Sequence, residues 1–221
     1  MVGKRKYDDG CAVAQALDVI GERWALLVVR DLLLGPKRFT DLLAGLPGAS
    51  SDVLTQRLRE LGDAGVVRRR RLAPPAGSWV YELTPWGAGL EEIVIGLARW
   101  AHESPQMRHD LPLGTDSLML SVKTLFDGRA AGDLQAKIAL TLEDEPFWIR
   151  IADGNLTMAR GEIENPDVTL DTDNATLLSL MQTDRPVDDA LSSGQLRLTG
   201  DRAVLDTFHE SVSGTRASDG H

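Results

Sequence analysis

The chain has one cysteine, four histidines and few aromatic residues, which make up 5% of its 221 residues. One thiol cannot build an internal disulfide framework, and it is too few for a cysteine-based structural zinc site. No stretch reaches the roughly 18 uncharged apolar residues that a membrane span needs. The basic N-terminus also lacks the apolar segment of a signal peptide behind it. The composition therefore predicts a globular, cytoplasmic protein with no membrane partner.

Signals of catalysis and of cofactor binding are missing as well. The histidines at 102, 109, 209 and 221 lack the spacing of metal ligands, and no glycine-rich loop resembles a nucleotide cradle. Serine, histidine and aspartate residues are too scattered to predict a catalytic triad. We therefore expect no enzyme activity, no cofactor and no metal site.

Charge is distributed unevenly between the two halves of the chain. Residues 1–108 contain 15 Lys and Arg against 13 Asp and Glu, a net charge of +2, whereas residues 109–221 contain 9 against 20, a net charge of −11. Such an asymmetry predicts two domains with different partners. Only the first half is suited to lie against a phosphate backbone.

The most informative stretch is ASSDVLTQRLRELGDA, residues 49–64. Two serines and Asp52 suit the start of a helix. Leu54, Leu58 and Leu61 then recur at the helical period and form one apolar stripe, so polar side chains occupy the opposite face. Alone, this pattern is typical of any surface helix. The segments on either side of it favour a more specific role.

The neighbouring segments predict a winged helix. Residues 39–46 form a second short amphipathic helix upstream, joined by the loop PGAS, which gives a helix–turn–helix. Downstream, residues 66–72 and 78–84 are strand-like and flank the turn signal APPAG, so they predict a hairpin. In this arrangement residues 51–59 enter a DNA major groove.

The predicted DNA contacts fall into two groups. Base edges would be read from the helix, where glutamine suits adenine and arginine suits guanine, by Ser51, Asp52, Thr55, Gln56 and Arg59; Asp52 either accepts from a cytosine amino group or merely caps the helix. Phosphates would be held by Lys37, Arg38, Arg57, Arg68, Arg69, Arg70 and Arg71. The alternative for these cations is ordinary solvated charge, and the four consecutive arginines can also be a solvated strand edge.

Three more helices complete the first half. Residues 12–20 are amphipathic, and residues 24–34 are apolar nearly all round, which predicts the buried core helix. A helix starting at Thr84 carries Trp86, Leu90, Ile93, Val94, Leu97 and Trp100 on one broad face. This is more apolar surface than a small winged domain can bury, so the sequence predicts a homodimer.

These landmarks resemble the HxlR family of bacterial winged-helix regulators over about the first 105 residues. The similarity lies in ERW, LLLGPKRFTDL, SSDVLTQRL and YELTPWG, together with a cysteine before a small helix. The resemblance implies a dimer that binds double-stranded DNA at an inverted-repeat operator, as a repressor or an activator.

In several members of that family, a cysteine at the place of Cys11 senses oxidants, quinones or aldehydes. Lys4, Arg5 and Lys6 lie nearby in sequence and would favour a thiolate. However, Ala12 stands where proline is common in the family. The alternative is that Cys11 is a small, partly buried core residue.

The second half reads as an α+β domain with a mostly antiparallel, five-stranded sheet. Strands are predicted at 134–142, 146–152, 155–160, 167–171 and 195–199, and helices at 116–126, 175–181, 186–192 and 202–212. We expect a winged domain over 1–104, a linker over 105–115, this α+β domain over 116–212 and a disordered tail over 213–221.

Residues ARGEIENPDVTLDTDNATLLSLM and ALSSGQLRLTGDRAVLDTF resemble a sterol-carrier-protein domain. The resemblance implies a tunnel for an apolar effector, with Leu118, Val122, Phe126, Ile138, Leu140, Phe147, Ile149, Ile151, Leu177, Leu180 and Met181 as the candidate lining. The same residues suit an ordinary closed core. The sequence thus predicts a DNA-binding regulator modulated by an apolar molecule. The alternatives are a thiol switch at Cys11 with a ligand-free second domain, and an apolar-ligand carrier whose winged domain serves assembly only.

Overall fold

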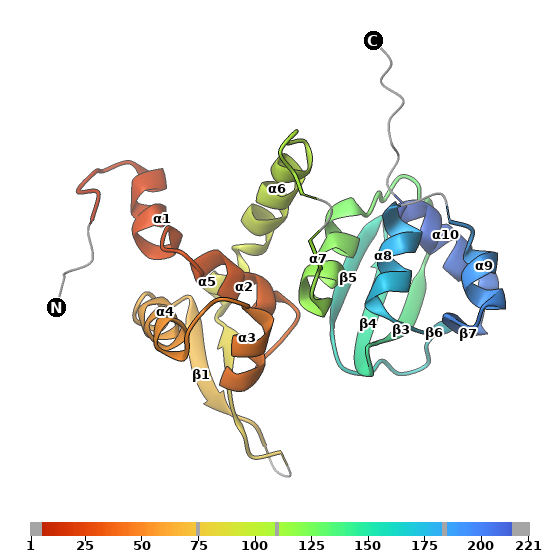
Figure 1. Ribbon diagram of the computed structural model, residues 1–221, viewed down its shortest axis with the longest axis horizontal. Coiled ribbons are helices and arrows are strands. Elements are labelled where there is room, and N and C mark those ends of the chain that lie inside the picture. Colours follow the sequence, from red (N-terminus) through yellow and green to blue (C-terminus); the bar gives the residue numbers. More distant parts are fainter. Residues whose placement is uncertain (1–5, 74–75, 109–110, 183–184, 214–221) are drawn as a thin grey trace. The chain divides into compact units, whose positions relative to one another are not determined.

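The computed structural model describes residues 6–73, 76–108, 111–182 and 185–213. The chain forms two compact units that divide between Leu97 and Ala98, and Figure 1 shows their elements. Several expectations fall outside the described residues: the tip of the predicted hairpin turn at 74–75, part of the linker at 109–110, the tail from 214, and the two cations Lys4 and Arg5.

The first unit is a helix–turn–helix followed by a two-stranded wing, as the sequence predicted. Its elements are α1 (Ala12–Ile20), α2 (Ala25–Leu33), α3 (Phe39–Gly45), α4 (Ser51–Asp63), β1 (Val67–Arg71), β2 (Trp79–Leu83), α5 (Pro85–Ala88) and the larger part of α6 (Glu91–His102). The two strands pair antiparallel, with Arg69 opposite Tyr81. An isolated bridge between Lys37 and Tyr81 ties the loop before α3 to the wing.

Local chemistry explains where α4 begins and ends. The Ser50 hydroxyl accepts a hydrogen bond from the Val53 amide at 3.3 Å and caps the helix. The leucine stripe at 54, 58 and 61 is buried. Gly65 follows the helix with a φ of +76°, in the left-handed region that favours glycine. The helix is thus held by its apolar stripe, and its polar side stays outward.

The segment after the wing is two helices, whereas the sequence predicted one. Thr84 caps α5 by accepting from the Gly87 amide at 3.0 Å. Gly87 packs so tightly that a Cβ there would lie 2.0 Å from the carbonyl oxygen of Val66. The chain turns after Ala88 and starts α6 at Glu91. The apolar periodicity continued through this break, which is why it did not reveal two helices.

The second unit is an α+β fold built on one sheet. Its elements are α7 (Thr115–Leu125), β3 (Ala136–Leu142), β4 (Glu145–Ala152), β5 (Asn155–Arg160), β6 (Val168–Thr172), α8 (Asn174–Gln182), α9 (Val187–Ser192), β7 (Leu196–Gly200) and α10 (Arg202–Val212). The strand order is β5-β4-β3-β6-β7. Every predicted strand and helix of this half is present, with ends that differ by at most two residues.

The sheet is mixed, so the prediction of a mostly antiparallel sheet is corrected. β6 runs parallel to β3, and the other neighbouring pairs are antiparallel. The cause is the segment 161–167, whose turn residues suggested a simple reversal. It starts at the Gly161 amide, 2.8 Å from the Pro146 carbonyl, and ends at the Asp167 amide, 2.8 Å from the Lys137 carbonyl. The segment therefore crosses from one end of the sheet to the other.

One face of this sheet forms the core. Ile138, Leu140, Phe147 and Ile149 are each no more than 3% exposed. Helices α7, α8 and α10 contact one another, and α10 also contacts β6. A hydrogen bond of 2.9 Å between His209 Nε2 and the Leu180 carbonyl joins α10 to α8. The alternating strand residues are therefore buried beneath a layer of helices.

None of the helices in the described parts of the chain is long and apolar enough to cross a bilayer. Over the same residues, no group of three or more His, Cys, Asp or Glu is placed to hold a metal ion.

Candidate DNA-binding surface

The outward face of α4 carries the polar side chains that the sequence assigned to base reading. Ser51, Asp52, Thr55, Gln56 and Arg59 are all exposed, whereas the leucines behind them are at most 4% exposed. Helix geometry places these side chains along one side, over about three turns. The arrangement is the one that a helix needs in order to present several donors and acceptors to a groove.

These side chains are ordered by bonds among themselves. Gln56 Nε2 donates to Glu60 Oε1 at 2.5 Å, and Arg59 Nη2 donates to Gln56 Oε1 at 3.0 Å. Glu60 was not among the predicted contacts. Its (i, i+4) spacing from Gln56 is the signal that would have found it. Any base contact by Gln56 or Arg59 must replace or share these bonds.

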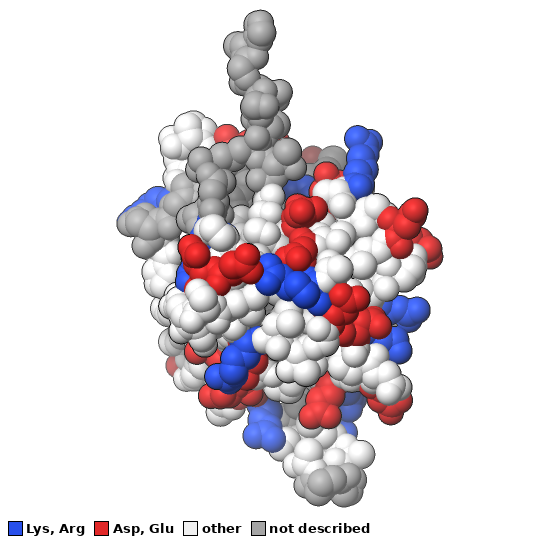
Figure 2. Space-filling model, turned by 90° about the vertical axis from the view of Figure 1, so that its right-hand side faces the viewer, with Lys and Arg blue, Asp and Glu red and all other residues white. Residues whose placement is uncertain are grey.

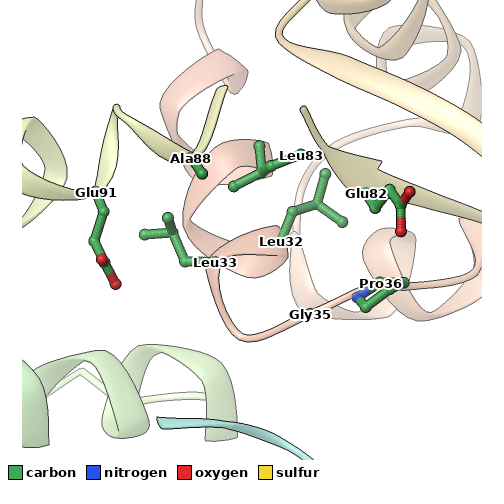
Figure 3. A pocket seen from close by; sticks show the side chains of 8 residues that line it. All are labelled: Leu32, Leu33, Gly35, Pro36, Glu82, Leu83, Ala88 and Glu91. Atoms are coloured by element: carbon green, nitrogen blue, oxygen red, sulfur yellow. The ribbon is translucent and has the colours of Figure 1, made fainter. Parts of the chain in front are cut away.

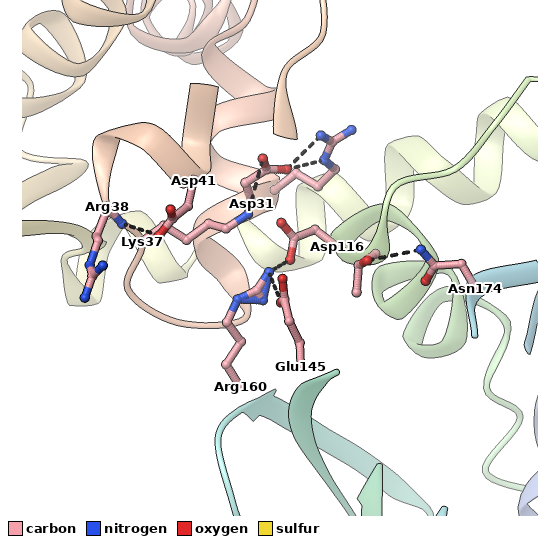
Figure 4. Close-up of polar contacts among 10 residues, drawn as sticks. Asp31, Lys37, Arg38, Asp41, Asp116, Glu145, Arg160 and Asn174 are labelled. Carbon is pink, nitrogen blue, oxygen red and sulfur yellow. Dashed lines mark hydrogen bonds and ion pairs between the residues drawn. The ribbon is translucent and has the colours of Figure 1, made fainter. Parts of the chain in front are cut away.

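Two of the predicted phosphate contacts lie against carboxylates: Lys37 is buried and Arg57 is partly buried. Lys37 is 8% exposed, and its Nζ lies 3.8 Å from Asp31 Oδ2, as Figure 4 shows. The Arg57 side chain is 12% exposed, with Nη1 2.5 Å from Glu60 and 3.8 Å from Glu22. Both cations therefore face carboxylates of the same unit, and a phosphate contact by either would have to replace or share these ion pairs. Arg38, by contrast, is exposed.

The four wing arginines separate into two pairs, as strand alternation requires. Arg69 stacks over the ring of Trp79 at 4.6 Å from its centroid, and Arg71 Nε donates to the Gly77 carbonyl at 2.9 Å. Arg68 Nε and Arg70 Nε donate to the two carboxylate oxygens of Glu82, at 2.8 and 2.5 Å. Arg68 and Arg70 therefore share one carboxylate, whereas Arg69 contacts an aromatic ring and Arg71 contacts a backbone carbonyl.

Glu82, like Glu60, is a residue of this surface that sequence reasoning missed. Burial raises the pKa of Glu82, but the hydrogen bonds and charges of Arg70 and Arg68 outweigh burial and hold that pKa below the usual glutamate value. The signal was available in the strand register, because an antiparallel pairing sets Glu82 opposite Arg68.

Beside the base of the wing lies a pocket of about 230 Å³, drawn in Figure 3. Its walls combine the end of α2, the end of β2 and the turn between α5 and α6. The lining combines apolar side chains with two carboxylates and consists of Leu32, Leu33, Gly35, Pro36, Glu82, Leu83, Ala88 and Glu91.

Cys11 is exposed at the N-terminus of α1, so it is not the partly buried core residue that the sequence allowed as an alternative. The backbone N–H groups of Ala14 and, less strongly, Val13 hold the pKa of the Cys11 thiol below its usual value. Helix-end amides therefore favour the thiolate here. The contribution expected from Lys4 and Arg5 lies outside the described residues.

The eleven candidate lining residues of the second unit come together around its core face. Ten are buried, at 8% exposure or less, and Phe126 is half-buried. This degree of burial is consistent both with an ordinary closed core and with a tunnel lined by these residues.

At one end of this core, Arg160 pairs with Asp116 and lies 3.7 Å from Glu145. Its guanidinium also covers the Phe147 ring, 5.0 Å from the ring centroid. Nearby, Asn174 Nδ2 donates to Thr115 Oγ1 at 3.1 Å (Figure 4). These contacts join β5 and α8 to the start of α7.

On the face of the second half that Figure 2 shows, the acidic excess does not form one uniform patch. On the face shown in Figure 2, acidic and basic side chains lie next to one another. Within this unit, Arg202 binds both Asp188 and Asp206 at 2.8 Å.

Comparison with known proteins divides the chain in a similar way. Residues 19–109 match the family described as HxlR-like helix-turn-helix, and residues 103–215 match the family described as alkyl sulfatase C-terminal. An uncharacterized HTH-type transcriptional regulator of Bacillus subtilis, YvaP, is 38% identical over 89 residues, which are 40% of this chain and 82% of YvaP.

Two solved structures are also similar. The quinone-bound YodB of B. subtilis shares 29% sequence identity with this chain and gives a TM-score of 0.37. The matched region is 42% of this chain and 97% of the YodB chain. A double mutant of the sec-alkyl sulfatase PisA1 shares 21% identity over 46% of this chain and 17% of its own, with a TM-score of 0.42. Through its first half the chain belongs to the HxlR-like helix-turn-helix family, and through its second half to the alkyl sulfatase C-terminal family.

Proposed function

We propose that this protein is a homodimeric transcription regulator that binds an inverted-repeat DNA operator through α4 and the wing. The observation that carries the proposal is the outward polar face of α4, where Asp52, Thr55, Gln56 and Arg59 are exposed over a buried leucine stripe. The four arginines of the wing, Arg68 to Arg71, supply phosphate or minor-groove contacts beside it. The relatives named as HTH-type transcriptional regulators support this role.

Exposed apolar side chains on α1 and α6 support the dimer. Val13 is 66% exposed, Ile93 52%, Leu97 47% and Trp100 70%. In α6 the last three recur at helical spacing, so they form one apolar stripe. Apolar stripes of this kind suit a contact with a second copy, and a two-fold dimer presents two reading helices to two half-sites.

Variants at Gln56 and Arg69 test the DNA contacts. A preferred operator is first selected from a random duplex library with the purified protein, and affinities are measured by fluorescence anisotropy at several salt concentrations. Gln56→Ala should weaken operator binding by about fivefold to 100-fold and relax sequence choice at one position. Arg69→Ala should weaken all duplexes alike and lower the salt slope by about 1. Parental affinity in both variants would refute the contact assignment.

We propose that DNA binding is regulated by an apolar molecule bound in the second unit. Two observations support this assignment: the match of this unit to the alkyl sulfatase C-terminal family and the apolar core face of its sheet. Such a ligand acts only through unequal affinity for two arrangements of the dimer. Modification of Cys11 is the second candidate, because its thiol is exposed and its pKa is lowered.

The Cys11 candidate predicts an unusual pH profile of thiol reactivity. Cys11 is the only cysteine, so alkylation by iodoacetamide reports on it alone. Because its pKa is lowered, the thiolate should persist to lower pH, and half-maximal reactivity should lie at a lower pH than that of the same thiol in the unfolded chain. The urea-unfolded chain is the matched control. Equal pH profiles in the folded and the unfolded chain, together with DNA binding by Cys11→Ser that is regulated as in the parent, would refute the Cys11 candidate. The apolar effector would then be the regulatory input.

A further inference from the structure

Glu82 holds two of the four wing arginines at once. Its carboxylate accepts Nε–H of Arg68 at 2.8 Å on one oxygen and Nε–H of Arg70 at 2.5 Å on the other. Arg68 lies directly opposite Glu82 in the strand register, and Arg70 is two residues further along the same face of β1. One carboxylate thus sets the position of two guanidinium groups.

The exposure of the three side chains shows how this cluster is oriented. The Glu82 side chain is 13% exposed, whereas Arg68 is 61% exposed and Arg70 is 42% exposed. Glu82 also lines the pocket between Leu32 and Leu83 (Figure 3), so its carboxylate sits at the packed base of the wing. A guanidinium has five N–H donors. Glu82 accepts the Nε–H of each arginine, and both arginine side chains keep a large exposed fraction.

The neighbouring arginines provide an internal contrast. Arg69 contacts the ring of Trp79, and Arg71 contacts a backbone carbonyl, so neither contact neutralises the cation. The cluster of Arg68, Arg70 and Glu82 carries a net charge of +1 where two unaccompanied arginines would carry +2. A bound phosphate would also meet the negative charge of Glu82 behind the two guanidinium groups.

We propose that Glu82 is a specificity-determining residue, which restrains the sequence-independent affinity of the wing while it positions Arg68 and Arg70 toward the DNA backbone. The inference rests on the proposed DNA-binding function. Because phosphate contacts carry affinity but no sequence information, lowering the charge of the wing makes total binding depend more on the bases read by α4.

The test compares Glu82→Gln with the parent on the selected operator and on an unrelated duplex, by anisotropy across a salt series. The variant should bind the unrelated duplex about threefold to tenfold more tightly near 0.1 M salt, with a salt slope steeper by up to about 1, because the wing gains one effective phosphate contact. The ratio of operator to unrelated affinity should fall. Glu92→Gln is the matched control, since Glu92 is an exposed carboxylate of the same unit.

Further variants separate the possible failures. Glu82→Met has a similar shape, suits the apolar pocket wall and should give the same gain, so it replaces the glutamine variant if that one does not fold. Adding Glu82→Gln to an Arg68→Gln, Arg70→Gln background should give no gain. If the parent binds no duplex, the proposed function fails. If the parent binds and Glu82→Gln behaves like Glu92→Gln, the inference about Glu82 is wrong and the proposed function stands.

Discussion

Replacing Asp31 with alanine should lower the free energy of unfolding of the first unit by about 3–5 kcal/mol. Asp31 is fully buried in α2 and pairs with Arg30 Nη2 at 2.7 Å. Its other oxygen faces the buried Lys37, whose backbone bridges to the wing at Tyr81. Alanine would leave the lysine charge without the carboxylate that faces it, and desolvated charge is costly. Chemical denaturation of the full chain, followed by tryptophan fluorescence, measures the change.

Asp41→Ala is the matched control for this experiment. Asp41 is exposed and accepts a 3.3 Å hydrogen bond from the Arg38 amide at the start of α3. Loss of such a contact at a helix start costs about 1 kcal/mol. A cost for Asp31→Ala no larger than that of Asp41→Ala would show that the buried pair does not stabilise the unit.

The double variant Ile93→Glu, Leu97→Glu should convert the proposed dimer into a monomer. It should also weaken operator binding by at least about 100-fold, because two linked reading helices gain from effective concentration and a single one does not. Both side chains are about half exposed, so the unit has little reason to unfold when they become polar. Sedimentation velocity reports the mass in solution, and anisotropy on the selected operator reports the affinity.

Leu111→Glu provides the control for a change of apolar surface to charge. Leu111 is 51% exposed and lies outside α1 and α6, so this variant should stay dimeric and bind as the parent does. A dimer that survives the Ile93 and Leu97 changes would locate the contact elsewhere. A monomer that binds the operator with parental affinity would refute the need for two half-sites.

Patterns that are local in sequence predicted the fold well. The leucine period of α4 and its serine start predicted a helix with one buried side and one exposed side. The structure confirms the buried leucines and the exposed polar side chains. Alternation in β3 likewise predicted which residues are buried. These features depend on neighbours within a few residues, so one sequence contains enough information to place them.

The errors arose where partners lie far apart in the chain. Lys37 and Arg57 have the residue type of phosphate contacts, but they pair with Asp31 in α2 and with Glu22 in the loop before α2, which the local pattern did not reveal. Glu82 was overlooked for the same reason, since its partners are 12 and 14 residues away. The direction of a strand also has no local signature, so the expectation of a mostly antiparallel sheet did not reveal that β6 runs parallel to β3. Tertiary pairing decides each of these features.

The crossover at 161–167 has a consequence for synthesis on the ribosome. Because β6 lies between β3 and β7, the hairpins of β3, β4 and β5 emerge while one side of β3 still lacks its partner. Such an edge exposes unpaired amides and carbonyls that invite association with other chains. The nascent second unit therefore passes through a vulnerable interval that closes only when β6 has been translated, whereas the winged unit has by then left the exit tunnel with its own pairings complete.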